Sequence, residues 1–184
     1  MILDKVVTHL ELSFPDDFVS GRPSPEVLSV ALCDVGSAEI LWSLHEEIGK
    51  SYYWKHRTFE FWVNWLSNPS TETWVISTPE QLAGIIDLEV QVDKGVEIVY
   101  FGLRPTFVGR GFGANALALA VQSAFTLRDR FTGVRNRVWL CTDDYDHPHA
   151  ISNYTKRGFR IFKVTNEQME VPDRQLKAFP PGPS

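Results

Sequence analysis

The segment from Glu97 to residue 125 constrains the fold more than any other part of this chain. An apolar run of strand length, residues 98–103, follows a single carboxylate at Glu97. After Pro105 come a loop with glycines at positions 109, 111 and 113 and then a small, apolar, helix-forming run at 115–125. A strand, a glycine loop and a helix N-terminus present backbone N–H groups to an anion, and glycine lets the backbone approach it closely. The sequence therefore predicts a site for a molecule with a phosphate or pyrophosphate.

Two common phosphate-binding loops do not match. The spacing Gly109-x-Gly111-x-Gly113 differs from G-x-G-x-x-G, and no acidic residue closes a second strand about 20 residues later. No Gly-Lys-Ser/Thr follows the loop, as a P-loop requires. A nucleotide-dependent oxidoreductase on a Rossmann scaffold is therefore disfavoured.

Two motifs in the right order resemble the GNAT N-acetyltransferase superfamily. The run 97–103 with Arg-Gly-Phe-Gly at 110–113 is similar to its acetyl-CoA loop, in the form found in the histone acetyltransferase branch. The run 150–159, Ala-Ile-Ser-Asn-Tyr-Thr-Lys-Arg-Gly-Phe, resembles the family's A-x-x-x-Y-x-x-x-G-F. Phrases at 138–142 and 146–148 look like a bacterial-type subgroup of undefined substrate. Val108 departs from the usual Gln or Arg, and His147 from a frequent Asn.

The resemblance implies an acetyl-CoA-dependent N-acyltransferase that acetylates a primary amine, more specifically a small-molecule amine, by direct transfer. The alternative is a GNAT-fold protein that binds coenzyme A without chemistry, as a sensor or interaction module. Acetyl-CoA would be the co-substrate, and no metal is expected. Its expected binding residues are Phe101, Gly102, Leu103, Val108, Gly109, Arg110, Gly111, Phe112, Gly113, Ala114 and Asn153.

Two proton transfers need candidate residues. An alkylammonium with a pKa of about 10.4 must lose a proton before it attacks, and a partly desolvated carboxylate can accept it. The resemblance gives Glu97 this role of base, while a strand-end Glu facing water is the other interpretation. Asp87, beside Glu89 on the polar face of the preceding strand, is the fallback, although a solvated face of the sheet explains each of these two carboxylates better. The resemblance also implies that Tyr154 protonates the leaving thiolate. The other interpretation is a helix tyrosine that packs on the sheet with its hydroxyl at the rim.

The aromatic-rich segment before the acetyl-CoA motif is the expected acceptor side. Tyr53 could wall a small-molecule amine, and Arg57 could hold a carboxylate. Packing of two helices explains these side chains equally well. At Trp62 and Trp65 we expect core packing.

Composition excludes several classes of protein. The net charge of −5 without a dense basic stripe argues against a nucleic-acid partner. Two cysteines fit a reduced compartment, with Cys141 expected as a packed thiol. No signal peptide or membrane span is evident, so we expect a cytoplasmic protein without a membrane partner. His147 and His149 lack metal-ligand spacing.

The order of elements predicts a single domain over 1–184 of the α/β (α+β) class, with helices on both faces of a mixed, largely antiparallel sheet. Residues 1–82 would form the acceptor-side half, 83–164 the acetyl-CoA-binding half, and 180–184 a loose tail. A homodimer is among the expected assemblies. The expected strands are 6–14, 27–32, 73–77, 85–92, 96–103, 137–142 and 159–164, and the expected helices begin near Ser37, Thr58, Asn115 and Pro148. Helical spacing places Ile40 on the buried stripe of the first helix, which Gly49 is expected to end. Strict alternation along 85–92 places the apolar residues through Val92 on one face and the polar residues on the other.

Overall fold

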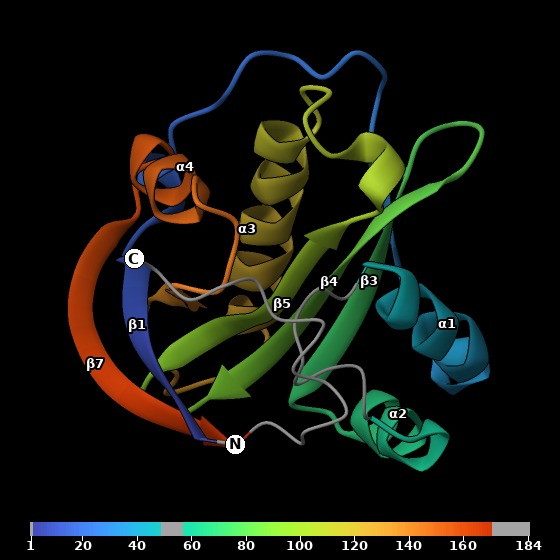
Figure 1. The fold of residues 1–184 in the computed structure, drawn as a ribbon. Coiled ribbons are helices and arrows are strands. Elements are labelled where there is room, and N and C mark those ends of the chain that lie inside the picture. Colours follow the sequence, from blue (N-terminus) through green and yellow to red (C-terminus); the bar gives the residue numbers. More distant parts are fainter. Residues whose placement is uncertain (1, 49–56, 171–184) are drawn as a thin grey trace.

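The computed structural model describes residues 2–48 and 57–170, in which seven strands form one sheet (Figure 1). The strands are β1 (Ile2–Leu12), β2 (Ser29–Leu32), β3 (Thr71–Ser77), β4 (Leu82–Gln91), β5 (Gly95–Leu103), β6 (Val138–Asp143) and β7 (Arg160–Glu170). The helices are α1 (Ala38–Ile48), α2 (Phe59–Ser67), α3 (Gly113–Asp129) and α4 (Ala150–Lys156). The expected class, a largely antiparallel sheet between helices, is confirmed.

The strand order is β2-β3-β4-β5-β6-β1-β7. Only β5 and β6 pair in parallel, while every other neighbouring pair is antiparallel. β1 therefore lies between two strands from the far end of the chain. The strand expected at 6–14 begins four residues earlier in the structure, at Ile2. Its central position in the sheet depends on long-range pairing that local sequence does not encode. The proposed division at residue 82 stays a prediction, although β1 lies among strands of the second half.

The two faces of the sheet carry different cores. α3 covers one face, where Ile86, Leu88 and Ile98 join the larger core. Helix α1 packs on the other face, where its side chains Leu41, Leu44 and Ile48 contact Ile85. The strict alternation along β4 that the sequence predicts produces this division.

Two expectations about side-chain placement were wrong. Ile40, expected on the buried stripe of α1, is 58% exposed, because that stripe instead includes His45. Val92, expected in line with the buried face of β4, is exposed because β4 ends at Gln91.

The start of α2 agrees with expectation, but the end of β7 does not. Thr58 caps α2 as predicted, since its Oγ1 accepts a hydrogen bond from the backbone N–H of Phe61 at 3.2 Å. β7 continues to Glu170, six residues past the expected end at Val164. The tail 180–184 and the expected helix stop at Gly49 lie outside the described residues. No helix in the described ranges is long and apolar enough to span a bilayer.

Candidate functional site

A bulge in β5 separates this strand from β6. Leu88 of β4 pairs with Ile98, and Asp87 pairs with Tyr100, so Val99 is the extra residue. Pairing of β5 with β6 ends at Glu97 and Trp139, although both strands continue. In the described part of the chain, no other strand pairs with this side of β5. Bulges bend strands and end pairing, and here residues 99–103 of β5 have no strand partner on the β6 side in the described part of the chain.

The same bulge decides which side chains face which core. After Val99, Phe101 and Leu103 pack against the larger core, while Tyr100 packs against the core under α1. Gly102 faces α1 as well, and a Cβ at this position would lie 2.5 Å from Cγ2 of Ile48. The glycine therefore lets α1 approach the exposed part of β5.

The glycine loop after β5 is anchored at both ends and open in the middle. Phe107 and Phe112 are buried, and their ring centroids lie 5.0 Å apart. Between them, Gly109 and Gly111 have φ of +76° and +90°, a region that favours glycine. No described atom lies within 4 Å of a Cβ built on Gly109. An anion can therefore approach the backbone here without displacing protein atoms.

The first turn of α3 has backbone donors without an acceptor among the described residues. Its N-cap residue, Phe112, makes no side-chain cap, and no acidic residue lies in the first turn. The first bond within this helix runs from the N–H of Ala116 to the carbonyl of Phe112 at 3.0 Å. The N–H groups of residues 113–115 therefore lack intrahelical acceptors, and with the helix dipole they suit a negatively charged group. Arg110 folds back, donating to the Thr106 carbonyl at 3.1 Å.

The long connection between β1 and β2 passes over this end of α3 (Figure 1). The side-chain amide of Asn115 donates to the carbonyl of Arg22 at 2.8 Å. The Arg157 guanidinium donates to the carbonyl of Ser20 at 2.7 Å, which ties the same connection to the end of α4. The connection thus borders the glycine loop, a placement that the sequence did not indicate.

Glu97 is half-buried on the face opposite α3. Burial and the neighbouring carboxylate of Glu89 raise the pKa of Glu97 to about 7, against smaller lowering effects of Gln91 and Lys94. The Gln91 side-chain amide donates to Oε2 of Glu97 at 2.7 Å. A strand-end carboxylate fully in water would keep its ordinary pKa, so the environment of Glu97 fits a base that works near neutral pH.

Asp87 has a different environment. Its side chain is fully buried, where it accepts a hydrogen bond from the Thr73 hydroxyl and lies 3.0 Å from Nε2 of His45. Trp62 stacks on the His45 ring at 4.3 Å, and Tyr100 lies against it at 4.7 Å. The solvated polar face that was the alternative for Asp87 is therefore wrong, because α1 and α2 cover it. A buried carboxyl group needs such polar partners, and the contact with His45 ties α1 to β4.

The buried pair predicts a stability effect for Asp87→Asn. Leaving a buried polar group without its matched partner typically costs about 1–3 kcal/mol of unfolding free energy. Chemical denaturation of this variant should therefore show a large loss, whereas Asp93→Asn in the exposed β4–β5 turn should stay within about 0.5 kcal/mol of the parent. An Asp87→Asn protein with unchanged stability would contradict this structural role.

Tyr154 lies on α4 with its ring packed against Phe159 at 5.8 Å and against the larger core. Burial first, and then the charges of Asp146 and Cys141, raise the pKa of the Tyr154 phenol. Asp146 also contributes to the raised pKa of Tyr100. The phenol is therefore protonated at neutral pH, as a proton donor must be.

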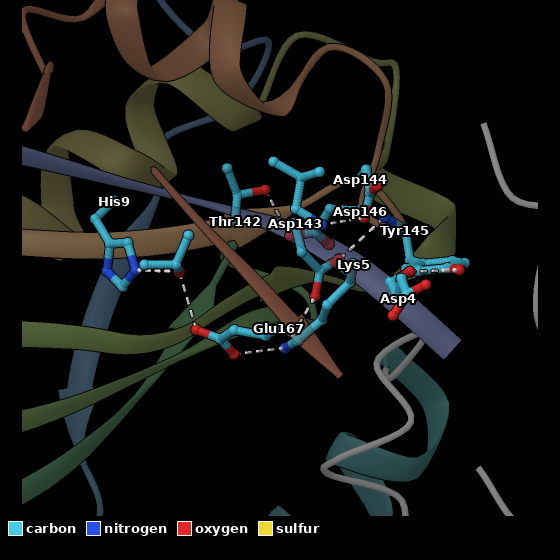
Figure 2. Close-up of polar contacts among 11 residues, drawn as sticks. Asp4, Lys5, His9, Thr142, Asp143, Asp144, Tyr145, Asp146 and Glu167 are labelled. Carbon is cyan, nitrogen blue, oxygen red and sulfur yellow. Dashed lines mark hydrogen bonds and ion pairs between the residues drawn. The ribbon is translucent and has the colours of Figure 1, made fainter. Parts of the chain in front are cut away.

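The loop before α4 is fixed to β1 (Figure 2). The backbone N–H of Val6 donates to Asp144 at 3.1 Å, and the Tyr145 hydroxyl donates to the Asp4 carbonyl at 3.1 Å. The Thr142 hydroxyl donates to Oδ2 of Asp146 at 2.7 Å (Figure 2). β1 therefore helps to position α4 and Tyr154.

A model of the acetyltransferase (GNAT) family matches residues 39–159. The chain belongs to that family. Solved structures agree in fold, beginning with a functionally unknown conserved protein from Staphylococcus epidermidis, with a TM-score of 0.66 and 16% identity over 91% of this chain and 61% of that one. A GCN5-related N-acetyltransferase from Kribbella flavida is also similar, with a TM-score of 0.62 and 16% identity over 97% of this chain and 63% of that one. Another, from Sphaerobacter thermophilus, has a TM-score of 0.61 and 21% identity over 90% of this chain and 50% of that one. At such identities the likeness shows the fold alone.

Two further results bound these comparisons. This GNAT chain spans between half and less than two thirds of the lengths of those three solved proteins. No curated protein matches it.

The remaining candidate residues of this GNAT chain lie on α4 and in or before α2 in the sequence. Asn153 is exposed on α4, one residue before Tyr154. The Arg57 guanidinium lies 4.4 Å from the centre of the Phe61 ring. Trp62 is fully buried, as expected. Tyr53 lies outside the described residues.

Sequence reasoning missed His45 and misplaced Cys141. A histidine on the buried stripe of α1, opposite a lone aspartate in a buried strand, was the available signal for the His45–Asp87 pair. Cys141, expected as a packed thiol, is exposed because it faces away from the core that its neighbours Leu140 and Thr142 enter. In the described residues, no group of three or more His, Cys, Asp or Glu side chains could hold a metal.

Proposed function

We propose that this GNAT chain transfers an acetyl group from acetyl-CoA to a primary amine of a small molecule. Family membership supports acyl transfer as the class of reaction. The observation that carries the finer proposal is the continuous path from the exposed edge of β5, through the open glycine loop, to the uncapped start of α3.

Acetyl-CoA fits this path in both of its chemical parts. Backbone groups at Phe101, Gly102 and Leu103 would lie along the thioester arm and stabilise its oxyanion. Backbone N–H groups from Val108 to Ala114 would surround the pyrophosphate. This cradle is formed by the main chain, so the departure at Val108 removes only a side-chain contribution. Asn153 would contact the pantetheine arm.

The reaction requires two proton movements. The amine nitrogen attacks the thioester carbonyl carbon, a C–N bond forms, and Glu97 accepts the proton that nitrogen loses, directly or through a water. The C–S bond then breaks, and the Tyr154 hydroxyl donates its proton to the departing sulfur. Glu97 is favoured over Asp87 as base, because the Asp87 carboxylate is enclosed by Thr73 and His45.

The acceptor side would involve Tyr53 and Arg57, which both precede α2 in the sequence. Arg57 could bind a carboxylate on the acceptor, which would favour a small amine of zwitterionic character. We keep the cytoplasmic location, and the absence of nucleic-acid and membrane partners, as parts of this proposal that rest on composition.

The test of this function is thiol release from acetyl-CoA with a panel of primary amines, with mass spectrometry of the products. We expect thiol release that depends on one class of amine, and an acetylated product. Tight binding of coenzyme A without thiol release with any amine would instead indicate a binding module without chemistry.

Gly111→Ala tests the phosphate-binding loop separately. At φ of +90° a Cβ strains the turn, so the N–H groups should lose their alignment. We expect coenzyme A affinity in calorimetry to fall by at least about tenfold, the equivalent of one lost good hydrogen bond.

Gly133→Ala is the matched control for this variant. It has a similarly positive φ of +77° and lies beyond the other end of α3. It should share the backbone strain and keep the affinity. Equal affinity in the Gly111→Ala protein and its parent would remove this loop from the site.

A further inference from the structure

Among the described residues, β7 is an edge strand of the sheet. It is the last strand in the order, and β1 is its only neighbour in the described part of the chain. Its 11 side chains are exposed except at Thr165 and Met169. A long exposed edge presents unpaired backbone donors and acceptors, which proteins normally cover, shorten or pair.

Apolar side chains lie beside this edge on the face that carries α3. Ile2 is 64% exposed, Val6 40% and Val164 56%. Val164 pairs with Thr8, so it projects on the same face as Thr8, Val6 and the core residue Leu10. Exposed apolar residues beside an open strand edge are typical of an interface with another protein.

The charges of β7 identify the partner. Arg160 and Lys163 lie in its first half, and Glu167 and Glu170 in its second. An antiparallel pairing of two identical strands lays each basic half against an acidic half. The strand is therefore complementary to a second copy of itself, as a two-fold interface requires.

The register follows from geometry. A two-fold axis perpendicular to the sheet keeps the faces of both copies aligned, and residues directly opposite each other must project on the same face. The axis must therefore lie midway between the two copies of one residue, so that this residue pairs with itself. Centred on Thr165, it sets Lys163 opposite Glu167 of the second copy. Both side chains project on the same face, because Lys163 pairs with His9 and Glu167 with Lys5. No other residue-centred register of β7 places Lys163 opposite an acidic residue.

We propose that two copies of this chain form a dimer through antiparallel pairing of their β7 strands about Thr165, which joins the two sheets into one. The bulge between His9 and Leu10 leaves residues 163–170 as the regular part of the strand. Within this part the Lys163–Glu167 pair occurs twice in the dimer, because of the two-fold symmetry. This dimer is independent of the proposed function, since neither side chain belongs to the site.

Charge reversal with complementation tests the dimer. Light scattering during gel filtration should give the parent chain twice the 20.9 kDa of one copy. Lys163→Glu sets a glutamate opposite each Glu167, and Glu167→Lys sets a lysine opposite each Lys163. Each variant alone should therefore run as a monomer, with its dissociation constant raised by about 10- to 100-fold.

An equimolar mixture of the two variants should restore a dimer. In the mixed dimer, position 163 of each copy again lies opposite a side chain of the other sign at position 167 of its partner. Such recovery also shows that each variant is folded, including Glu167→Lys, whose parent side chain lies 3.6 Å from Lys5 (Figure 2).

Arg135→Glu is the control, with the same change in charge on an exposed residue before β6. It should remain a dimer. A monomeric parent chain, or a dimer that both single variants leave intact, would overturn the proposal.

Discussion

Glu97→Gln should lower turnover by roughly the 10²–10⁴-fold typical of general acid–base catalysis, while the affinity for acetyl-CoA stays unchanged. The amide keeps the shape of the side chain but cannot accept the amine proton. Saturating thiol-release assays give the first quantity and calorimetry gives the second. High pH should restore part of the lost rate, because the free amine then needs no base.

The pH profile gives this prediction a sharper form. With a pKa of about 7, Glu97 becomes an active base only as the pH rises through that value, so the parent rate should rise there. The pH–rate profile of Glu97→Gln should lack this rise near neutral pH. Glu89→Gln removes the neighbouring charge that helps to raise the pKa, so the rise in its profile should move to lower pH without loss of the maximal rate. A parent profile flat across neutral pH would contradict the role of Glu97.

Stability supplies an independent check on the same carboxyl group. Its pKa is higher in the folded chain than its ordinary value, so the folded state binds more protons between about 4.5 and about 7. The contribution of Glu97 to stability must then fall as the pH rises through that window. Glu97→Gln has no such ionisation and should be at least as stable as the parent above pH of about 7. Loss of activity in this variant therefore cannot be explained by unfolding.

Tyr154→Phe should lower turnover by a similar factor, roughly 10²–10⁴-fold. The ring keeps its packing on Phe159, so stability and acetyl-CoA affinity should barely change. High pH should bring no recovery, since the missing group is an acid. Pre-steady-state thiol release would locate the loss at the departure of sulfur.

Tyr100→Phe is the comparison for this prediction, because burial raises the pKa of both phenols and Asp146 adds to both shifts. It should retain most of the activity. A larger loss in Tyr100→Phe than in Tyr154→Phe would move the acid to β5.

Local patterns predicted the fold well where one segment contained the whole signal. The alternation of apolar and polar residues along β4 gave its two faces, and Thr58 gave the start of α2. The glycine loop and the start of α3 followed from residues 105–125. Each depends on neighbours in sequence, so the residues themselves carry the information.

Features that depend on long-range contacts were not accessible in this way. The bulge at Val99 lies inside a uniformly apolar run, where an extra residue leaves no trace in hydrophobicity. The pairing of His45 with Asp87 joins a helix and a strand 42 positions apart, and β1 reaches its central place by pairing with β6 and β7. The elevated pKa of Glu97 likewise required knowing that Glu89 lies opposite it across the β4–β5 ladder.

Hydrogen exchange with and without acetyl-CoA tests the central claim most directly, because it needs no knowledge of the acceptor. Backbone amides of the exposed part of β5, the glycine loop and the first turn of α3, residues 99–115, should become protected when acetyl-CoA is added. The Gly111→Ala protein at the same concentration should show much weaker protection. Unchanged exchange in residues 99–115 of the parent, or protection confined to another part of the chain, would contradict the account.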